Sequence, residues 1–159
     1  MTVRREYCAV DGAPTGMPTL CRPVQQVYVG DLLEVRLTLT LPQVRHFVML
    51  ADRYPAGFAP LAVIQTALPV TPVSLTSSMT PTLTGAWRDP FEHYELTDEQ
   101  AIFFARALLA GTYQVIYRLR AVLPGVYQTM PATARAVYFP ELWGRSEGGV
   151  LGVLPAQGD

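Results

Sequence analysis

In the stretch Leu32-Leu-Glu-Val-Arg-Leu-Thr-Leu-Thr-Leu41, apolar and polar side chains alternate from Leu33 to Leu41. A period of two is typical of a β-strand that has one buried face and one polar face. Glu34 falls on the polar face, Gly30-Asp31 form a turn signal before the stretch, and Pro42 ends it. The residues expected to face the core are Leu33, Val35, Leu37, Leu39 and Leu41.

The run Thr112–Val122 repeats this pattern, with Tyr113 and Tyr117 inward and Arg118 and Arg120 outward. Shorter strands are predicted at His46–Asp52, Phe91–Leu96, Ala101–Ala105, Val126–Met130 and Thr133–Phe139. The segment Glu99–Leu109 fits helical spacing about as well as strand alternation, so strand is the interpretation and one short helix is the alternative. Short strands without strand–helix alternation predict an all-β, antiparallel β-sandwich.

Length and composition exclude several classes of protein. A chain of 159 residues fits one domain, and an apolar fraction of 50% excludes intrinsic disorder. The net charge of −1 provides no basic excess for nucleic acid. The charge-free stretch Tyr54–Trp87 is interrupted by prolines, which argues against a membrane span. Its part from Pro69 to Gly85 is rich in Pro, Ser and Thr and predicts a long surface loop.

The sequence lacks the usual patterns of a catalytic, cofactor or metal site. It has no Gly-x-Ser-x-Gly elbow and no lysine for a Schiff base, and its acidic residues are scattered singly. His93 and Glu95 share one face of a predicted strand, and a surface strand whose polar residues face water is the favoured interpretation. We expect neither enzyme activity nor a cofactor nor a bound metal.

Cys8 and Cys21 do not form a CxxC or zinc-binding spacing. They flank a turn-forming stretch around Gly12, so a disulfide between them is reasonable in an oxidising compartment. The alternative is two small buried thiols that pack as apolar side chains.

The second half carries a longer pattern, which ends in Tyr138-x-Pro140-Glu141-x-x-Gly144-Arg145-Ser146. Together with Leu109-Ala-Gly-Thr-Tyr113, Tyr117-Arg-Leu-Arg-Ala121 and Pro124-Gly125, it resembles the C-terminal macroglobulin-like domain of bacterial alpha-2-macroglobulins. The first half agrees in Val3-Arg-Arg-Glu-Tyr7 and Asp52-Arg-Tyr-Pro-Ala-Gly-Phe58. Residues 1–159 are accordingly interpreted as a single macroglobulin-like domain from a much larger chain.

The resemblance implies a non-catalytic domain of a protease trap that lies outside the cytoplasm, in the periplasm or at the bacterial cell surface. Its implied partners are sibling domains of the parent chain, including a domain that carries a Gly-Cys-x-Glu-Gln thioester, and proteases through the full-length protein. The chain departs from the family pattern at Met130 and at Arg135-Ala-Val137, where the family usually has a proline and an acidic-x-Met sequence.

The family-motif residues are interpreted as structural or interdomain positions. Three glycines are expected at turns that need a positive φ, namely Gly57, Gly111 and Gly125. Tyr138 is predicted in the core, and Arg145 either pairs with Glu141 or reaches a neighbouring domain. The complete set is Gly57, Gly111, Tyr113, Arg120, Gly125, Tyr138, Pro140, Glu141, Gly144 and Arg145. The rival hypothesis is an independent carbohydrate- or protein-binding surface module that uses Trp87 and the long loop.

Overall fold

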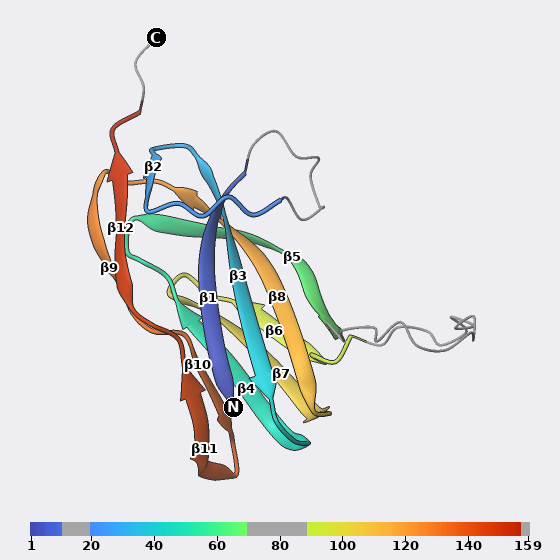
Figure 1. The fold of residues 1–159 in the computed structure, drawn as a ribbon. Coiled ribbons are helices and arrows are strands. Elements are labelled where there is room, and N and C mark those ends of the chain that lie inside the picture. Colours follow the sequence, from blue (N-terminus) through green and yellow to red (C-terminus); the bar gives the residue numbers. More distant parts are fainter. Residues whose placement is uncertain (11–19, 70–88, 157–159) are drawn as a thin grey trace, which may run out of the picture.

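The computed structural model describes residues 1–10, 20–69 and 89–156, and these ranges contain strands and no helix (Figure 1). Within the same ranges, no helix has the length and apolarity to cross a membrane. The predicted loop 69–85 and Trp87 fall almost entirely outside the described residues. The strands are β1 (Thr2–Ala9), β2 (Gln26–Tyr28), β3 (Leu32–Leu41), β4 (Arg45–Arg53), β5 (Phe58–Pro69), β6 (His93–Leu96), β7 (Gln100–Leu108), β8 (Gly111–Ala121), β9 (Gly125–Thr129), β10 (Thr133–Ala136), β11 (Phe139–Arg145) and β12 (Gly149–Leu154).

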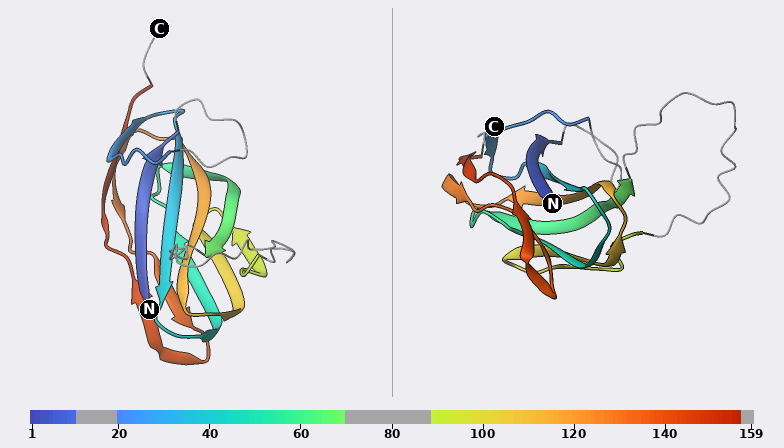
Figure 2. Two further views of the ribbon diagram at one scale, coloured as in Figure 1. Left: turned by 45° about the vertical axis from the view of Figure 1, so that its right-hand side comes forward. Right: turned by 60° about the horizontal axis from the view of Figure 1, so that its bottom comes forward.

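Two antiparallel sheets lie face to face, which confirms the predicted sandwich (Figures 1 and 2). One has the strand order β1-β3-β8-β5 and the other β11-β10-β4-β7-β6. The five apolar residues predicted to face inward from β3 are all at most 2% exposed. Across the interface, the rings of Phe103 and Tyr117 lie 6.2 Å apart. The alternation in the sequence therefore identifies the core face correctly.

A third, three-stranded sheet has the order β2-β12-β9 and lies beside the sandwich (Figure 1). β12 pairs antiparallel to β9 but parallel to β2, so the fold is not antiparallel throughout. Val27, Leu151 and Val153 point from this sheet into the common core and are at most 5% exposed. The small sheet thus extends the same core and does not form a second domain.

A disulfide joins Cys8 to Cys21, with their Cα atoms 5.0 Å apart. Of the two alternatives for these residues, the disulfide is therefore correct and the pair of buried thiols is not. The segment that follows Cys21 lies along β1 and pairs with it. The Ala9 N–H donates to the carbonyl of Arg22 at 3.0 Å, and the Val24 N–H donates to the carbonyl of Tyr7 at 2.9 Å. The disulfide therefore holds a short segment over part of an otherwise open sheet edge.

Several local predictions need correction. The predicted strand Thr133–Phe139 is broken by a turn at Val137 and Tyr138, so β10 and β11 form a hairpin. Glu34 lies on the outward face as predicted, but it is 0% exposed because Arg36 and Arg118 pair with it at 2.7 and 3.4 Å. The alternative helix over Glu99–Leu109 is strand β7 instead.

Candidate interaction site

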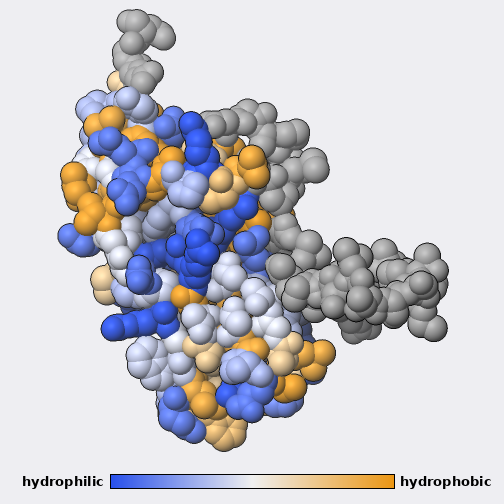
Figure 3. Space-filling model, viewed as in Figure 1, coloured by the Kyte–Doolittle hydropathy of each residue, from blue (hydrophilic) through white to orange (hydrophobic). Residues whose placement is uncertain are grey.

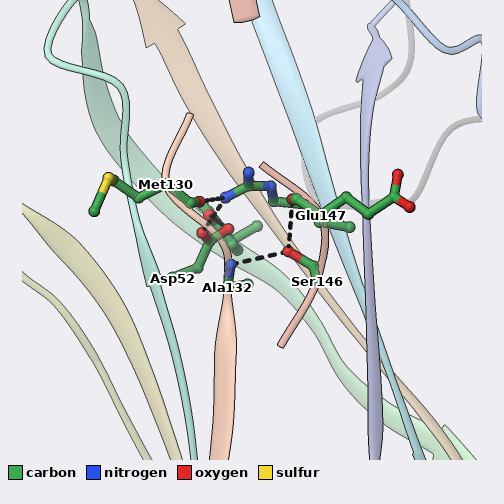
Figure 4. A network of polar contacts seen from close by, with 7 residues as sticks. Asp52, Met130, Ala132, Ser146 and Glu147 are labelled. Carbon is green, nitrogen blue, oxygen red and sulfur yellow. Dashed lines mark hydrogen bonds and ion pairs between the residues drawn. The ribbon is translucent and has the colours of Figure 1, made fainter. Parts of the chain in front are cut away.

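A buried ion pair connects the two large sheets. The Arg5 Nη1 atom of β1 lies 2.6 Å from Asp52 Oδ1 of β4, and the two side chains are 3% and 1% exposed. The Tyr117 hydroxyl of β8 donates to the other carboxylate oxygen at 2.7 Å. Arg5 Nη1 also donates to the carbonyl of Met130 at 2.6 Å, and Figure 4 shows Asp52 and Met130 within this network. Three strands and one connecting segment are therefore tied together inside the core.

The interior shifts the proton affinities of these groups. Burial raises the pKa of the Asp52 carboxyl, while the Arg5 guanidinium and the Tyr117 hydroxyl oppose that rise. Burial and the nearby Asp52 carboxylate raise the pKa of Tyr117 well above its ordinary value, and the same two causes raise the pKa of Tyr7. Because the charges of Arg5 and Asp52 are almost fully buried and satisfied by one another, we interpret the network as structural.

Ser146, the last residue of the family motif, joins two connecting segments. Its Oγ accepts a hydrogen bond from the Ala132 N–H at 2.9 Å and donates to the Glu147 carbonyl at 3.0 Å, as Figure 4 shows. Its own N–H donates to the Ala132 carbonyl at 2.8 Å. The side chain is buried, so its role is to fix the end of β11 against the start of β10.

The outer face of the five-stranded sheet combines aromatic, aliphatic and arginine side chains. Strand pairing aligns two rows across it, and we call their ten residues the aromatic–arginine face. The first row is Trp143, Arg135, Met49, Phe104 and His93, and the second is Arg145, Thr133, Ala51, Ile102 and Glu95. The four central apolar residues are partly exposed, and Trp143 is 56% exposed. A sheet face turned to water is usually polar, so this composition makes the face a candidate contact surface.

The β10–β11 hairpin at the margin of this face is held by an unusual residue. Phe47 interrupts the pairing of β4 with β7 and has a φ of 52°, which is rare for a bulky side chain. Its carbonyl accepts the Val137 N–H at 2.8 Å, and its ring meets that of Tyr138 edge-on at 4.9 Å. Tyr138 is 69% exposed, so the prediction that it lies in the core was wrong. Tyr138 lies in the turn between β10 and β11.

The three motif glycines have two different physical roles. Gly111 and Gly125 have φ values of 153° and 156°, as expected for turns that favour glycine. Gly57 does not have a positive φ, which corrects the prediction. A Cβ at Gly57 would overlap the ring of Tyr127, so a close approach explains the absence of a side chain. Gly144 is similar, because a Cβ there would meet the backbone carbonyl of Met1.

The remaining motif residues divide between interior and surface. Tyr113 is buried as predicted, and its hydroxyl donates to the Leu109 carbonyl at 3.0 Å. Arg120 is exposed on the outer face of the four-stranded sheet, and Pro140, Glu141 and Arg145 are exposed on β11. Glu141 and Arg145 form no ion pair with each other in the described structure, which removes the first of the two roles predicted for Arg145. The second role, contact with a neighbouring domain, stays a prediction.

His93 and Glu95 are exposed on β6, which agrees with the surface-strand interpretation. Among the described residues, no group of three or more His, Cys, Asp or Glu side chains is arranged to hold a metal ion. Neither the Arg5–Asp52 pair nor the aromatic–arginine face is predictable from the sequence alone. Neither Arg5 nor Asp52 looks unusual in its own segment of the sequence. That both side chains point into the core becomes visible only when the two sheets that contain β1 and β4 are assembled.

The described residues thus form a β-sandwich domain with a structural polar network inside and a mixed aromatic and arginine surface outside. Residues 1–141 match the family model for the bacterial alpha-2-macroglobulin MG10 domain, and the chain belongs to that family. This confirms the resemblance and the prediction of a non-catalytic domain. No curated protein sequence is similar enough to count as a match.

Solved structures of bacterial alpha-2-macroglobulins share the fold. Salmonella alpha-2-macroglobulin reacted with methylamine matches 97% of this chain with a TM-score of 0.70 and 19% identity. Trypsin-activated alpha-2-macroglobulin from Escherichia coli matches 97% with a TM-score of 0.68 and 18% identity. The chain spans only 9% and 10% of those proteins. A cohesin from Archaeoglobus fulgidus has a TM-score of 0.50 and 10% identity over 97% of this chain and 92% of its own.

Proposed function

We propose that this domain is a packing domain of a bacterial protease trap, in which it contacts sibling domains and helps to shield a thioester-bearing domain until a protease cleaves the parent chain. The observation that carries the proposal is the family match over residues 1–141. The solved relatives include an alpha-2-macroglobulin activated by trypsin, which supports a role in a protein that responds to proteases.

The architecture suits a rigid element that acts through its surface. The Arg5–Asp52 pair and the disulfide fix the strand order from the inside and at one edge. The aromatic–arginine face leaves Trp143 more than half exposed and thus available to a neighbour. Aromatic and arginine residues are enriched where protein surfaces meet.

The disulfide supports a location outside the cytoplasm, in the periplasm or at the cell surface. Cytoplasmic thiol systems keep most cysteines reduced, whereas exported domains retain such bonds. The Cys8–Cys21 bond also holds the paired segment on β1, so it has a structural use in the folded domain. A thiol titration of the protein purified from its native compartment should find both cysteines unreactive until reductant is added.

The direct test is binding to the recombinant thioester-bearing domain of the same parent gene, measured by biolayer interferometry up to high micromolar concentration. That range suits a weak contact between domains that are normally linked. Saturable binding that is lost after thermal unfolding of this domain is expected. A lack of binding over the whole range, with both partners folded, would refute contact with the thioester domain.

A further inference from the structure

The two arginines of the aromatic–arginine face lie on its β10–β11 side and have no acidic partner. Arg135 and Arg145 are exposed, and neither side chain forms an ion pair or hydrogen bond within the described structure. Glu95 lies at the far end of the same row as Arg145, four strand spacings away. That separation is about 19 Å, beyond the distance of about 8–10 Å over which salt screens exposed charges. A nearer acid is Glu141, two residues from Trp143 on β11, and it is exposed and forms no ion pair with either arginine.

The outer face of the four-stranded sheet provides the contrast. Most of its charged residues are paired: Arg36 and Arg118 with Glu34, and Arg4 with Glu6 at 2.8 Å. Arg120 is the exception on this face, because it is exposed and forms no ion pair within the described structure. Figure 3 shows hydrophilic side chains gathered across the middle of this face. A surface whose charges are already paired gains little from an oppositely charged partner. The five-stranded sheet differs in that its two unpaired arginines lie beside partly exposed apolar side chains, which suits it to recognise an acidic group.

Apolar side chains surround one of these arginines. Arg135 lies between Trp143 on β11 and Met49 on β4 in the strand register, and Phe104 follows Met49 in the same row. A carboxylate bound there would meet a charged donor beside surface that excludes water, which strengthens the ion pair. The flat apolar centre also favours a folded protein surface over a nucleic acid, whose phosphates require several clustered cations.

We propose that the aromatic–arginine face docks a neighbouring domain of the parent chain that presents carboxylates beside an apolar patch. Arg135 and Arg145 bind the carboxylates, and Trp143 with Met49 and Phe104 forms the apolar centre. This inference rests on the proposed function and assigns both the face and the chemistry of its partner.

The test uses the recombinant parent chain that lacks this domain as the binding probe, with the separately produced domain as analyte. The charge-reversed variant Arg135→Glu/Arg145→Glu should bind at least tenfold more weakly than the wild type. Raising the salt from 50 to 500 mM should weaken wild-type binding several-fold and leave the variant nearly unchanged. Trp143→Ala should weaken binding by a similar factor at both salt concentrations, because its contribution is apolar.

The control is Arg4→Glu, which reverses a 73% exposed arginine on the opposite sheet and should bind within twofold of the wild type. All variants are exposed at the changed positions, and their urea midpoints verify that they fold. If the wild type binds but Arg135→Glu/Arg145→Glu binds equally well, or if Arg4→Glu loses as much affinity, the assigned face is wrong while the proposed function stands. If the wild type does not bind the probe, the proposed function fails and this inference fails with it.

Discussion

Removal of one member of the buried Arg5–Asp52 pair should destabilise the domain at least as much as removal of both. The variant Arg5→Met leaves the Asp52 carboxylate 1% exposed without its cation, and Asp52→Leu leaves the guanidinium 3% exposed without its anion. An uncompensated buried charge costs roughly 3–5 kcal/mol. For a domain of this size, that loss lowers the melting temperature by roughly 6–20 °C, at about 2–4 °C per kcal/mol.

The double variant Arg5→Met/Asp52→Leu removes both charges and keeps the volumes similar. It leaves the Tyr117 hydroxyl and the Met130 carbonyl without their partners, which costs about 3 kcal/mol in total. The two single effects would sum to roughly 6–10 kcal/mol, so the double-mutant cycle should give a coupling of at least about 3 kcal/mol.

Urea unfolding followed by circular dichroism measures the free energy of unfolding for the four proteins of this cycle. The exposed variant Arg4→Met is the matched control on the same strand, because its pair with Glu6 is 2.8 Å long but 73% exposed on the arginine side. A pair of that kind contributes at most about 1 kcal/mol. Single variants that each cost less than the control, or effects that simply add, would refute the interpretation of the network as a structural link between the sheets.

Two further predictions concern pH and redox state. Burial raises the folded-state pKa of Tyr7 and Tyr117, so above their ordinary pKa of about 10 they ionise only on unfolding. Their contribution to the free energy of unfolding is therefore full below about pH 10, and above it declines by up to about 3 kcal/mol per pH unit for the two tyrosines together. Urea unfolding at pH 8–11 can measure this decline because the chain has no lysine that titrates in the same range. The variant Tyr117→Phe should show a shallower decline, and a stability that stays constant to pH 11 would contradict the raised pKa values. Reduction of the disulfide should lower the free energy of unfolding by roughly 3 kcal/mol for a loop of this length. The double Cys→Ala variant should be destabilised equally, and reductant should not change its stability. Equal urea midpoints for the oxidised, reduced and Cys→Ala proteins would exclude a stabilising role of the disulfide.

Local alternation was enough to predict the central strands. β3 has the predicted bounds, and β8 differs from its prediction by one residue at each end. β1, β5 and β12 were not predicted as strands, because Arg5 interrupts the apolar set of β1, Pro60 lies within β5, and β12 has no polar alternation. In each case the missing information is the partner strand, which a single sequence does not contain.

The candidate site was predictable only in part. The motif pattern pointed to the β10–β11 region, since Tyr138, Pro140 and Arg145 belong to it, but exposure of Tyr138 depends on a turn formed without Gly or Asn. The aromatic–arginine face is assembled from four strands and part of a fifth, and its members look ordinary in their own segments. The sequence alone does not show that Arg135 and Arg145 form no ion pair within the described structure.

The parallel pairing of β2 with β12 affects how the domain is made on the ribosome. Residues 26–28 pair with residues 152–154, so this contact can form only after more than 120 further residues have been synthesised. Contacts between such distant segments close slowly, and a nascent chain with the β3–β8 pairs formed still exposes Val27 and the groove that Leu151 and Val153 fill. Chains whose translation stops before β12 are therefore expected to be clients of chaperones and proteases, even with most of the sandwich already folded.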